Sequence, residues 1–147
     1  MSIDRFQRSF KLNSNSKFRT YGLNHLIRFA KIQIMVRIYH NPRCRKSRQA
    51  LQLLETLENN YEVIEYLKTP LKFEELKSIL KKLHLKPVDL IRKSENIFKE
   101  KYKDKKLTEE QWIEAMIINP ALIERPILVK GDMAIIGRPP ENIKTLY

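Results

Sequence analysis

The sequence predicts an α/β fold in which a small mixed β-sheet is flanked by helices on both faces, with a helical insertion between two pairs of strands. Three observations support this prediction. A strand–helix–strand pattern fills residues 36–67 and predicts two parallel strands joined by a crossover helix. Three helical segments follow without an intervening strand. Two short apolar runs then flank Gly131-Asp132, which is typical of a β-hairpin.

Each element has its own local signal. Val36–His40 is rich in β-branched and aromatic residues and predicts a strand, as does Tyr61–Leu67. Between them, apolar residues at helical spacing predict a helix over 47–57. A capping-box pattern, Thr108 with Gln111, opens a later helix. The remaining elements are helices at 73–83, 87–91, 96–102 and 108–118, strands at 127–130 and 133–136, and a helical turn after Pro139-Pro140.

Residues 1–34 differ from the remainder in composition. They hold seven Lys or Arg and one acidic residue, so they carry +6 of the net charge of +12. Three interpretations remain open: a mitochondrial-type presequence, a disordered basic arm, or a leader translated upstream of a start at Met35. We favour the last, because the folded pattern begins at Met35. We therefore expect a basic N-terminal extension, residues 1–34, and one folded domain, residues 35–147.

We expect the extension to be dispensable. A chain of residues 35–147 should keep the thermal midpoint and the activity of the full-length protein, because the first strand of the fold begins after it. Thermal unfolding and an activity assay on both chains measure this, and a large loss in either quantity would contradict the expectation.

Composition argues against several classes of protein. No apolar run approaches the roughly 20 residues that span a bilayer, so we expect no membrane association. The basic charge comes without a recognition motif, so we expect no nucleic-acid partner. His25, His40, His84 and Cys44 lack the spacing of metal ligands, so we expect no metal. A single cysteine excludes an intrachain disulfide and suits a reducing, cytoplasmic location.

Cys44 is the strongest candidate for a reactive group. It lies where the first strand meets the first helix, among three cationic side chains, with His40 and Ser47 available as hydrogen-bond donors. Helix N-terminal amides and positive charge lower a cysteine pKa from about 8.5 toward about 3.5–7.5. We therefore expect a thiolate that can attack a tetrahedral anion bound at the same helix end. The alternative is a buried structural cysteine.

Three arginines stand apart from the helix faces and are candidate ligands for such an anion. Arg92 follows a short helix, and Arg125 and Arg138 each precede a proline, which restricts their backbone to extended geometry. A guanidinium is a planar, permanent cation that binds oxygens in pairs. By spacing alone, the ordinary interpretation of each is a solvated surface charge.

The motifs Tyr39-His40-Asn41-Pro42-x-Cys44-x-x-Ser47, Glu124-Arg125-Pro126 and Gly137-Arg138-Pro139 resemble, in order and spacing, the arsenate reductase family of the glutaredoxin-coupled, thioredoxin-fold type. The resemblance covers the chain from Met35 onward and is closest to the compact bacterial branch. It implies a thioredoxin-like fold with a cis peptide bond between Arg125 and Pro126. By this resemblance Cys44 is the nucleophile. Arg92, Arg125 and Arg138 are catalytic and bind the substrate oxyanion, and His40 and Ser47 tune the thiol.

The same resemblance implies an enzyme that reduces arsenate, or another small oxyanion, through a thiol–arsenate intermediate on Cys44. Because the chain has no second cysteine, the resolving thiol would come from glutathione, with glutaredoxin as the partner protein. Glutathione would be a co-substrate, and no bound cofactor is implied.

Two other functions fit this fold class. An Spx-like regulator would bind RNA polymerase, but such proteins usually carry a Cys-x-x-Cys switch, and here Ser47 takes the second cysteine position. A glutaredoxin-like thiol–disulfide oxidoreductase is the other alternative.

Overall fold

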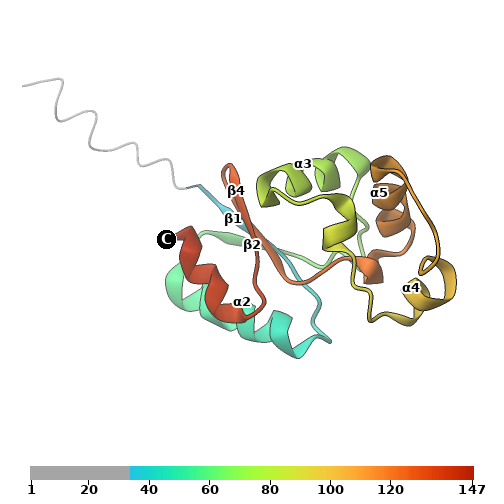
Figure 1. The fold of residues 1–147 in the computed structure, drawn as a ribbon. Helices are drawn as coiled ribbons and strands as arrows, with labels where there is room; N and C mark the ends of the chain where they lie inside the picture. Colours follow the sequence, from blue (N-terminus) through green and yellow to red (C-terminus); the bar gives the residue numbers. More distant parts are fainter. Residues whose placement is uncertain (1–33) are drawn as a thin grey trace, which may run out of the picture. The chain divides into compact units, whose positions relative to one another are not determined.

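The structure, a computed structural model, describes residues 34–147, so residues 1–33 of the predicted extension lie outside the described residues. Figure 1 shows the order of the elements along the chain. They are β1 (Val36–Tyr39), α2 (Arg45–Leu57), β2 (Tyr61–Ile64), α3 (Phe73–Leu83), the short helical segment η1 (Pro87–Leu90), α4 (Asn96–Lys101), α5 (Glu109–Ile118), η2 (Pro120–Leu122), β3 (Ile127–Lys130), β4 (Met133–Ile136) and η3 (Pro140–Leu146).

The four strands form one mixed sheet in the order β2-β1-β3-β4. β1 and β2 run parallel, with Tyr39 opposite Ile64, which confirms the predicted strand–helix–strand unit. β3 is antiparallel to both β1 and β4, so the predicted hairpin closes the second half of the sheet. The helical insertion between the two strand pairs is present as predicted.

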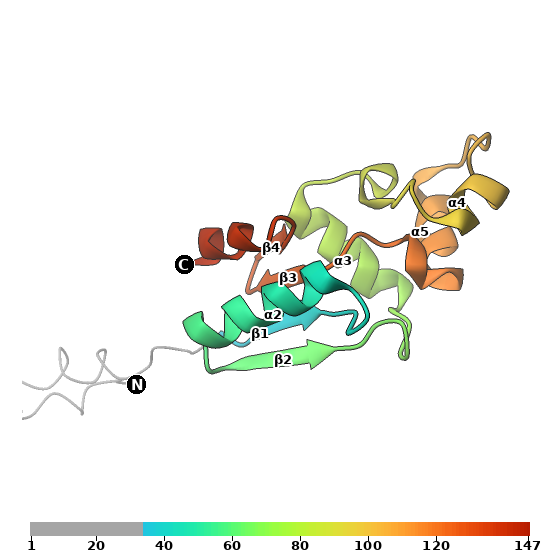
Figure 2. The same cartoon turned by 90° about the horizontal axis from the view of Figure 1, so that it is seen from below.

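Helices cover both faces of the sheet, as the alternation of apolar residues requires. Val36 and Ile38 of β1 share one buried cluster with α2 and η3. Tyr39 and residues from β3 share the other cluster with α3, η1 and α5. Figures 1 and 2 show the sheet between these two groups of helices. Each face of the sheet thus packs against a different part of the chain.

The predicted strand Tyr61–Leu67 is too long, because β2 ends at Ile64. Among residues 34–147 its neighbour in the sheet is β1, which ends at Tyr39 opposite Ile64, so this ladder cannot continue. The chain then turns: the amides of Lys68 and Thr69 both donate to the Glu65 carbonyl. Tyr66 therefore lies in this turn, beyond the end of the strand.

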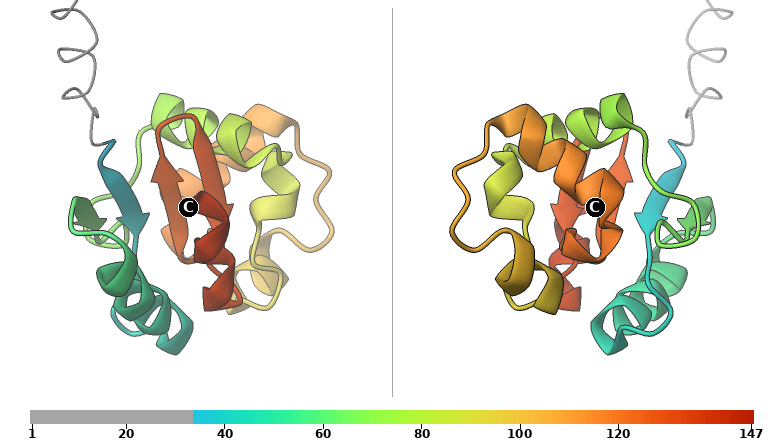
Figure 3. Two further views of the ribbon diagram at one scale, coloured as in Figure 1. Left: turned by 90° about the vertical axis from the view of Figure 1, so that its left-hand side faces the viewer. Right: turned by 90° about the vertical axis from the view of Figure 1, so that its right-hand side faces the viewer.

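Two local signals are confirmed. The hairpin turns at Gly131, whose φ of 59° lies in the left-handed region that favours glycine. Figure 3 shows this turn beside α3, where Lys82 Nζ donates to the Gly131 carbonyl at 2.7 Å. At the start of α5, Thr108 and Gln111 form both hydrogen bonds of the capping box.

Candidate active site

The sheet topology brings the predicted site segments to one end of the sheet. β1 ends at Tyr39, which pairs with Ile127, the first residue of β3. Ile127 also pairs with Ile136, the last residue of β4. The chain leaving β1, the chain entering β3 and the chain leaving β4 therefore meet. These three segments carry the predicted nucleophile and both Arg-Pro pairs.

Backbone hydrogen bonds hold the arginine segments against one another. The Gly137 amide donates to the Pro126 carbonyl at 2.8 Å, which joins the exit of β4 to the entry of β3. The Arg92 amide donates to the Leu122 carbonyl at 2.7 Å, so the chain after η1 runs beside the chain that leads to Arg125. Segments that are separated along the chain, by 30 residues in the case of Arg92 and Leu122, are thus joined by main-chain contacts, and these contacts position the arginines.

Cys44 is the N-cap residue of α2, between strand and helix as the sequence predicts, and it is partly exposed. Burial acts to raise the pKa of its thiol, but the backbone amides of Ser47 and Lys46 and the nearby Arg125 outweigh this effect. The pKa of Cys44 is therefore lowered. The helix N-terminus contributes through directed N–H groups, and the guanidinium contributes through charge.

His40 and Ser47 lie in the segment around Cys44 and are both buried. The Ser47 hydroxyl shares a hydrogen bond of 2.9 Å with His40 Nδ1 and accepts one of 3.1 Å from the Asn41 amide. The hydroxyl is thus used to shape the loop, and Ser47 acts on the Cys44 thiol through its backbone amide. Burial lowers the pKa of His40, so the imidazole is neutral at pH 7.

Arg92 and Arg125 form the centre of a charged cluster. Their side chains are only 13% and 12% exposed, so neither is the solvated surface charge that spacing alone suggested. Arg125 donates to the Ala121 carbonyl at 3.0 Å and, through Nη2, to Glu95 Oε1 at 3.2 Å. Arg92 pairs with the same Glu95 oxygen, and its Nε lies 3.7 Å from a carboxylate oxygen of Glu124.

Arg138 differs from the other two predicted arginines because it is exposed. It is still part of the same electrostatic environment. Burial and the charge of Arg125 lower the pKa of Arg92, and Arg138 adds to that effect. The peptide bond from Arg125 to Pro126 is cis, as predicted, and the bond from Arg138 to Pro139 is cis as well.

Two residues of the cluster were missed at the level of sequence. Glu95 lies three residues after Arg92, a helical pairing distance that was an available signal. Tyr66 lies just beyond the end of β2, and the ends of parallel strands meet at one edge of a sheet. Burial raises the pKa of Tyr66 to about 12, against the opposing effect of Arg125. Both residues depend on which segments meet in space.

The alkylation of Cys44 should show an inflection with pH below the value of about 8.5 for a free thiol. The lowered pKa keeps the thiolate, which is the reacting form, populated at pH values where a free thiol is protonated. The rate of iodoacetamide incorporation against pH measures this, and Cys44→Ser supplies the background because the chain has one cysteine. An inflection at or above the free-thiol value would contradict the assignment.

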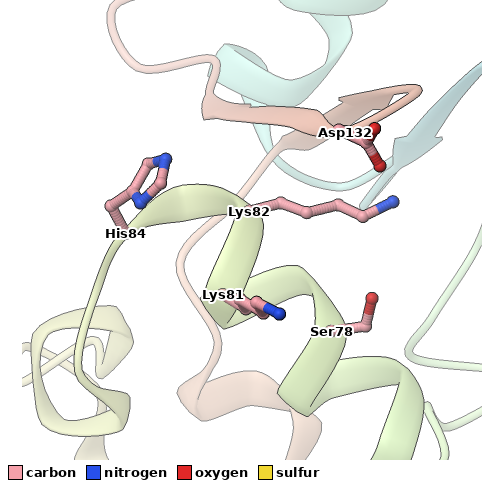
Figure 4. Close-up of a pocket in the computed structure, with 5 residues that line it drawn as sticks. All are labelled: Ser78, Lys81, Lys82, His84 and Asp132. Atoms are coloured by element: carbon pink, nitrogen blue, oxygen red, sulfur yellow. The ribbon is translucent and has the colours of Figure 1, made fainter.

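A pocket of about 410 Å³ lies between α3 and the hairpin turn (Figure 4). It is near the end of β3 and β4 that is opposite to the arginines. Lysines in the last turn of a helix stabilise it through the helix dipole, which explains the two that lie here. We therefore assign these charges to the fold. The pocket is lined by Ser78, Lys81, Lys82, His84 and Asp132.

Two features are absent from residues 34–147. No group of three or more His, Cys, Asp or Glu side chains in this range could hold a metal ion. Within the same range, no helix is both long enough and apolar enough to cross a membrane.

Known proteins share these segments. The profile of the ArsC family matches residues 39–146. The chain is 46% identical over 110 residues to the uncharacterized protein YfgD of Escherichia coli K12, covering 74% of this chain and 92% of that protein. It is 42% identical over 113 residues to an arsenate reductase of Neisseria meningitidis serogroup A, covering 76% and 97%. The solved arsenate reductase from Vibrio cholerae matches with a TM-score of 0.73 and 41% identity, covering 78% of this chain and 98% of that chain.

Proposed function

Because the chain belongs to the ArsC family, we propose that it is a thiol-dependent reductase of arsenate or a closely similar oxyanion, with Cys44 as its nucleophile. Full-length relatives named arsenate reductase support the activity, and we propose that residues 35–147 carry it. The single observation that carries the proposal is the position of a cysteine with a lowered pKa at a helix N-terminus beside Arg125.

The proposed first step is attack of the Cys44 thiolate on arsenic. A sulfur–arsenic bond forms and an arsenic–oxygen bond breaks, with the oxygen leaving as hydroxide that takes a proton to become water. Arsenic stays in the +5 state. Arg92 and Arg125 would stabilise the charge on the arsenate oxygens, with Arg138 adding positive potential. The amides of Lys46 and Ser47 would hold the thiolate before attack.

The proposed second step uses glutathione as co-substrate. Its thiolate attacks the Cys44 sulfur and a disulfide forms between the two sulfurs. The sulfur–arsenic bond breaks, its electron pair goes to arsenic, and arsenic leaves as arsenite in the +3 state. Glutaredoxin would then exchange with the mixed disulfide and regenerate the thiol. The single cysteine of the chain supports an external donor and suits a reducing, cytoplasmic location.

The test is steady-state reduction of arsenate by the purified chain with glutathione and glutaredoxin, measured as arsenite formed. We expect turnover that requires all three components. A regulator that binds RNA polymerase would instead co-purify with the polymerase and reduce no arsenate. A glutaredoxin-like oxidoreductase would reduce a mixed disulfide of glutathione without arsenate. Either outcome in place of arsenate turnover would reject the proposed function.

A further inference from the structure

The carboxylate of Glu95 lies between Arg92 and Arg125, the two arginines of the site whose side chains are mostly shielded from solvent. Its Oε1 accepts from Arg125 Nη2 at 3.2 Å and pairs with Arg92 Nη1. Glu95 is also the N-cap residue of α4, but its side chain makes no capping hydrogen bond. The carboxylate is therefore committed to the arginines, and a single oxygen of it serves both of them.

We propose that Glu95 occupies the oxyanion subsite formed by Arg92 and Arg125, and that the anionic substrate binds there by displacing it. This inference rests on the proposed function, because the displacing ligand is the tetrahedral oxyanion that Cys44 attacks. A guanidinium group donates paired N–H hydrogen bonds both to carboxylates and to oxyanions. The two therefore compete for the same N–H donors. Glu95 then sets how tightly the oxyanion binds.

Donors beside Glu95 that lack an acceptor support the binding of a ligand with several oxygens. Glu95 offers the arginines a single carboxylate oxygen. Arg125 Nε is buried and finds no hydrogen-bond acceptor among residues 34–147. The hydroxyl of Tyr66, a residue only 1% exposed, interacts with the Arg125 guanidinium but finds no acceptor for its own proton in this part of the chain. Buried polar groups are nearly always paired, so two donors without an acceptor in one cluster require an explanation. A tetrahedral oxyanion supplies acceptors for both.

The opposite role for Glu95 is a permanent brace that orients the two arginines for the substrate. The two roles predict opposite changes in anion affinity when Glu95 is neutralised. If Glu95 competes, neutralising it frees the guanidinium groups and strengthens anion binding. If Glu95 braces them, the same change loosens the arginines and weakens anion binding. The other carboxylate near Arg92 is Glu124, at 3.7 Å from its Nε, and it is the same in both cases.

The test compares Glu95→Gln with the wild-type chain, using inorganic phosphate as the probe. Phosphate should slow the alkylation of Cys44 by iodoacetamide. For each protein, the rate with phosphate is divided by the rate of the same protein without phosphate. We expect the half-protecting concentration to fall by about tenfold in Glu95→Gln, the factor that corresponds to one displaced charge-assisted contact. Glu62→Gln is the matched control, because the Glu62 side chain is half-exposed and its ion pair within residues 34–147 is with Arg37, at 4.0 Å. The control should stay within about twofold of wild type, since an exposed pair of this kind contributes little.

Equal or weaker protection in Glu95→Gln would overturn the inference, and so would an equal gain in Glu62→Gln. Absence of any protection of the wild-type chain would also overturn it, because there would be no oxyanion subsite to occupy. Glu95→Ala serves as a second variant with no residual amide to pair with the arginines, and it should show the same gain. Protection by phosphate does not require turnover. The inference can therefore hold if arsenate is not reduced, and can fail if it is.

Discussion

Replacing Cys44 with serine should abolish arsenate reduction, lowering the rate by at least about 10³-fold. The serine hydroxyl stays protonated near neutral pH, and no other sulfur in the chain can take the place of the thiolate. The amides of α2 and the Arg125 guanidinium lower the pKa of the Cys44 thiol in the wild-type chain, and the variant has no thiol on which they can act. Arsenite formation with glutathione and glutaredoxin measures the effect.

The fold should survive this change, because Cys44 is partly exposed and its side chain caps no helix. The thermal midpoint of Cys44→Ser should therefore match that of the wild-type chain. Activity retained at more than one tenth of the wild-type rate in a folded variant would show that the reaction does not pass through Cys44. Mass spectrometry of the wild-type chain should in turn find the glutathione mixed disulfide on this residue.

Replacing Arg125 with lysine should lower kcat/KM for arsenate by about 10²-fold. Lysine keeps the positive charge but cannot reproduce the guanidinium that donates both to the Ala121 carbonyl and to Glu95. The rate at which iodoacetamide alkylates Cys44 should change little. This neutral reagent does not need the paired N–H donors of a guanidinium, and lysine keeps the positive charge that favours the thiolate. The two assays together separate substrate binding from thiol activation.

Arg37→Lys is the matched control for this change. The Arg37 side chain is half-exposed and lies 4.0 Å from Glu62 on β2. Both assays should be unaffected there. If Arg125→Lys is also silent in both assays, Arg125 is a structural residue at the entry to β3 and the proposed oxyanion role is wrong. A parallel loss of alkylation would indicate that Arg125 acts mainly on the thiol.

Most of the fold follows from local patterns. Apolar spacing predicted α3 at 73–83, and the turn at Gly131 separates two strands that match their predicted bounds. The capping box predicted the start of α5. The thioredoxin-like class, which the motifs implied, is supported by the ArsC family match and by the solved structures. The miss at β2 arose because apolar and aromatic residues continue past Ile64, whereas the neighbouring strand does not.

The candidate site was predictable in its residue types and less so in its contacts. Cys44 at a helix N-terminus is a local property, since one strand–helix junction creates it. The hydroxyl of Ser47 was expected to donate to the sulfur, but it pairs with His40, which lies seven residues earlier. Which acceptor a buried hydroxyl finds depends on how the loop closes, and periodicity carries no information about that.

The sequence by itself therefore determined the order and type of the elements, the one thiol, and the arginines that could serve an anion, because these depend on residue identity and short-range spacing. Only the tertiary structure decided which charges meet. Glu95 and Arg125 are 30 residues apart and are joined because the chain after η1 pairs with the chain before β3. Hydrogen bonds and ion pairs act over a few ångströms, so partners distant in sequence are set by the register and packing that bring their segments together.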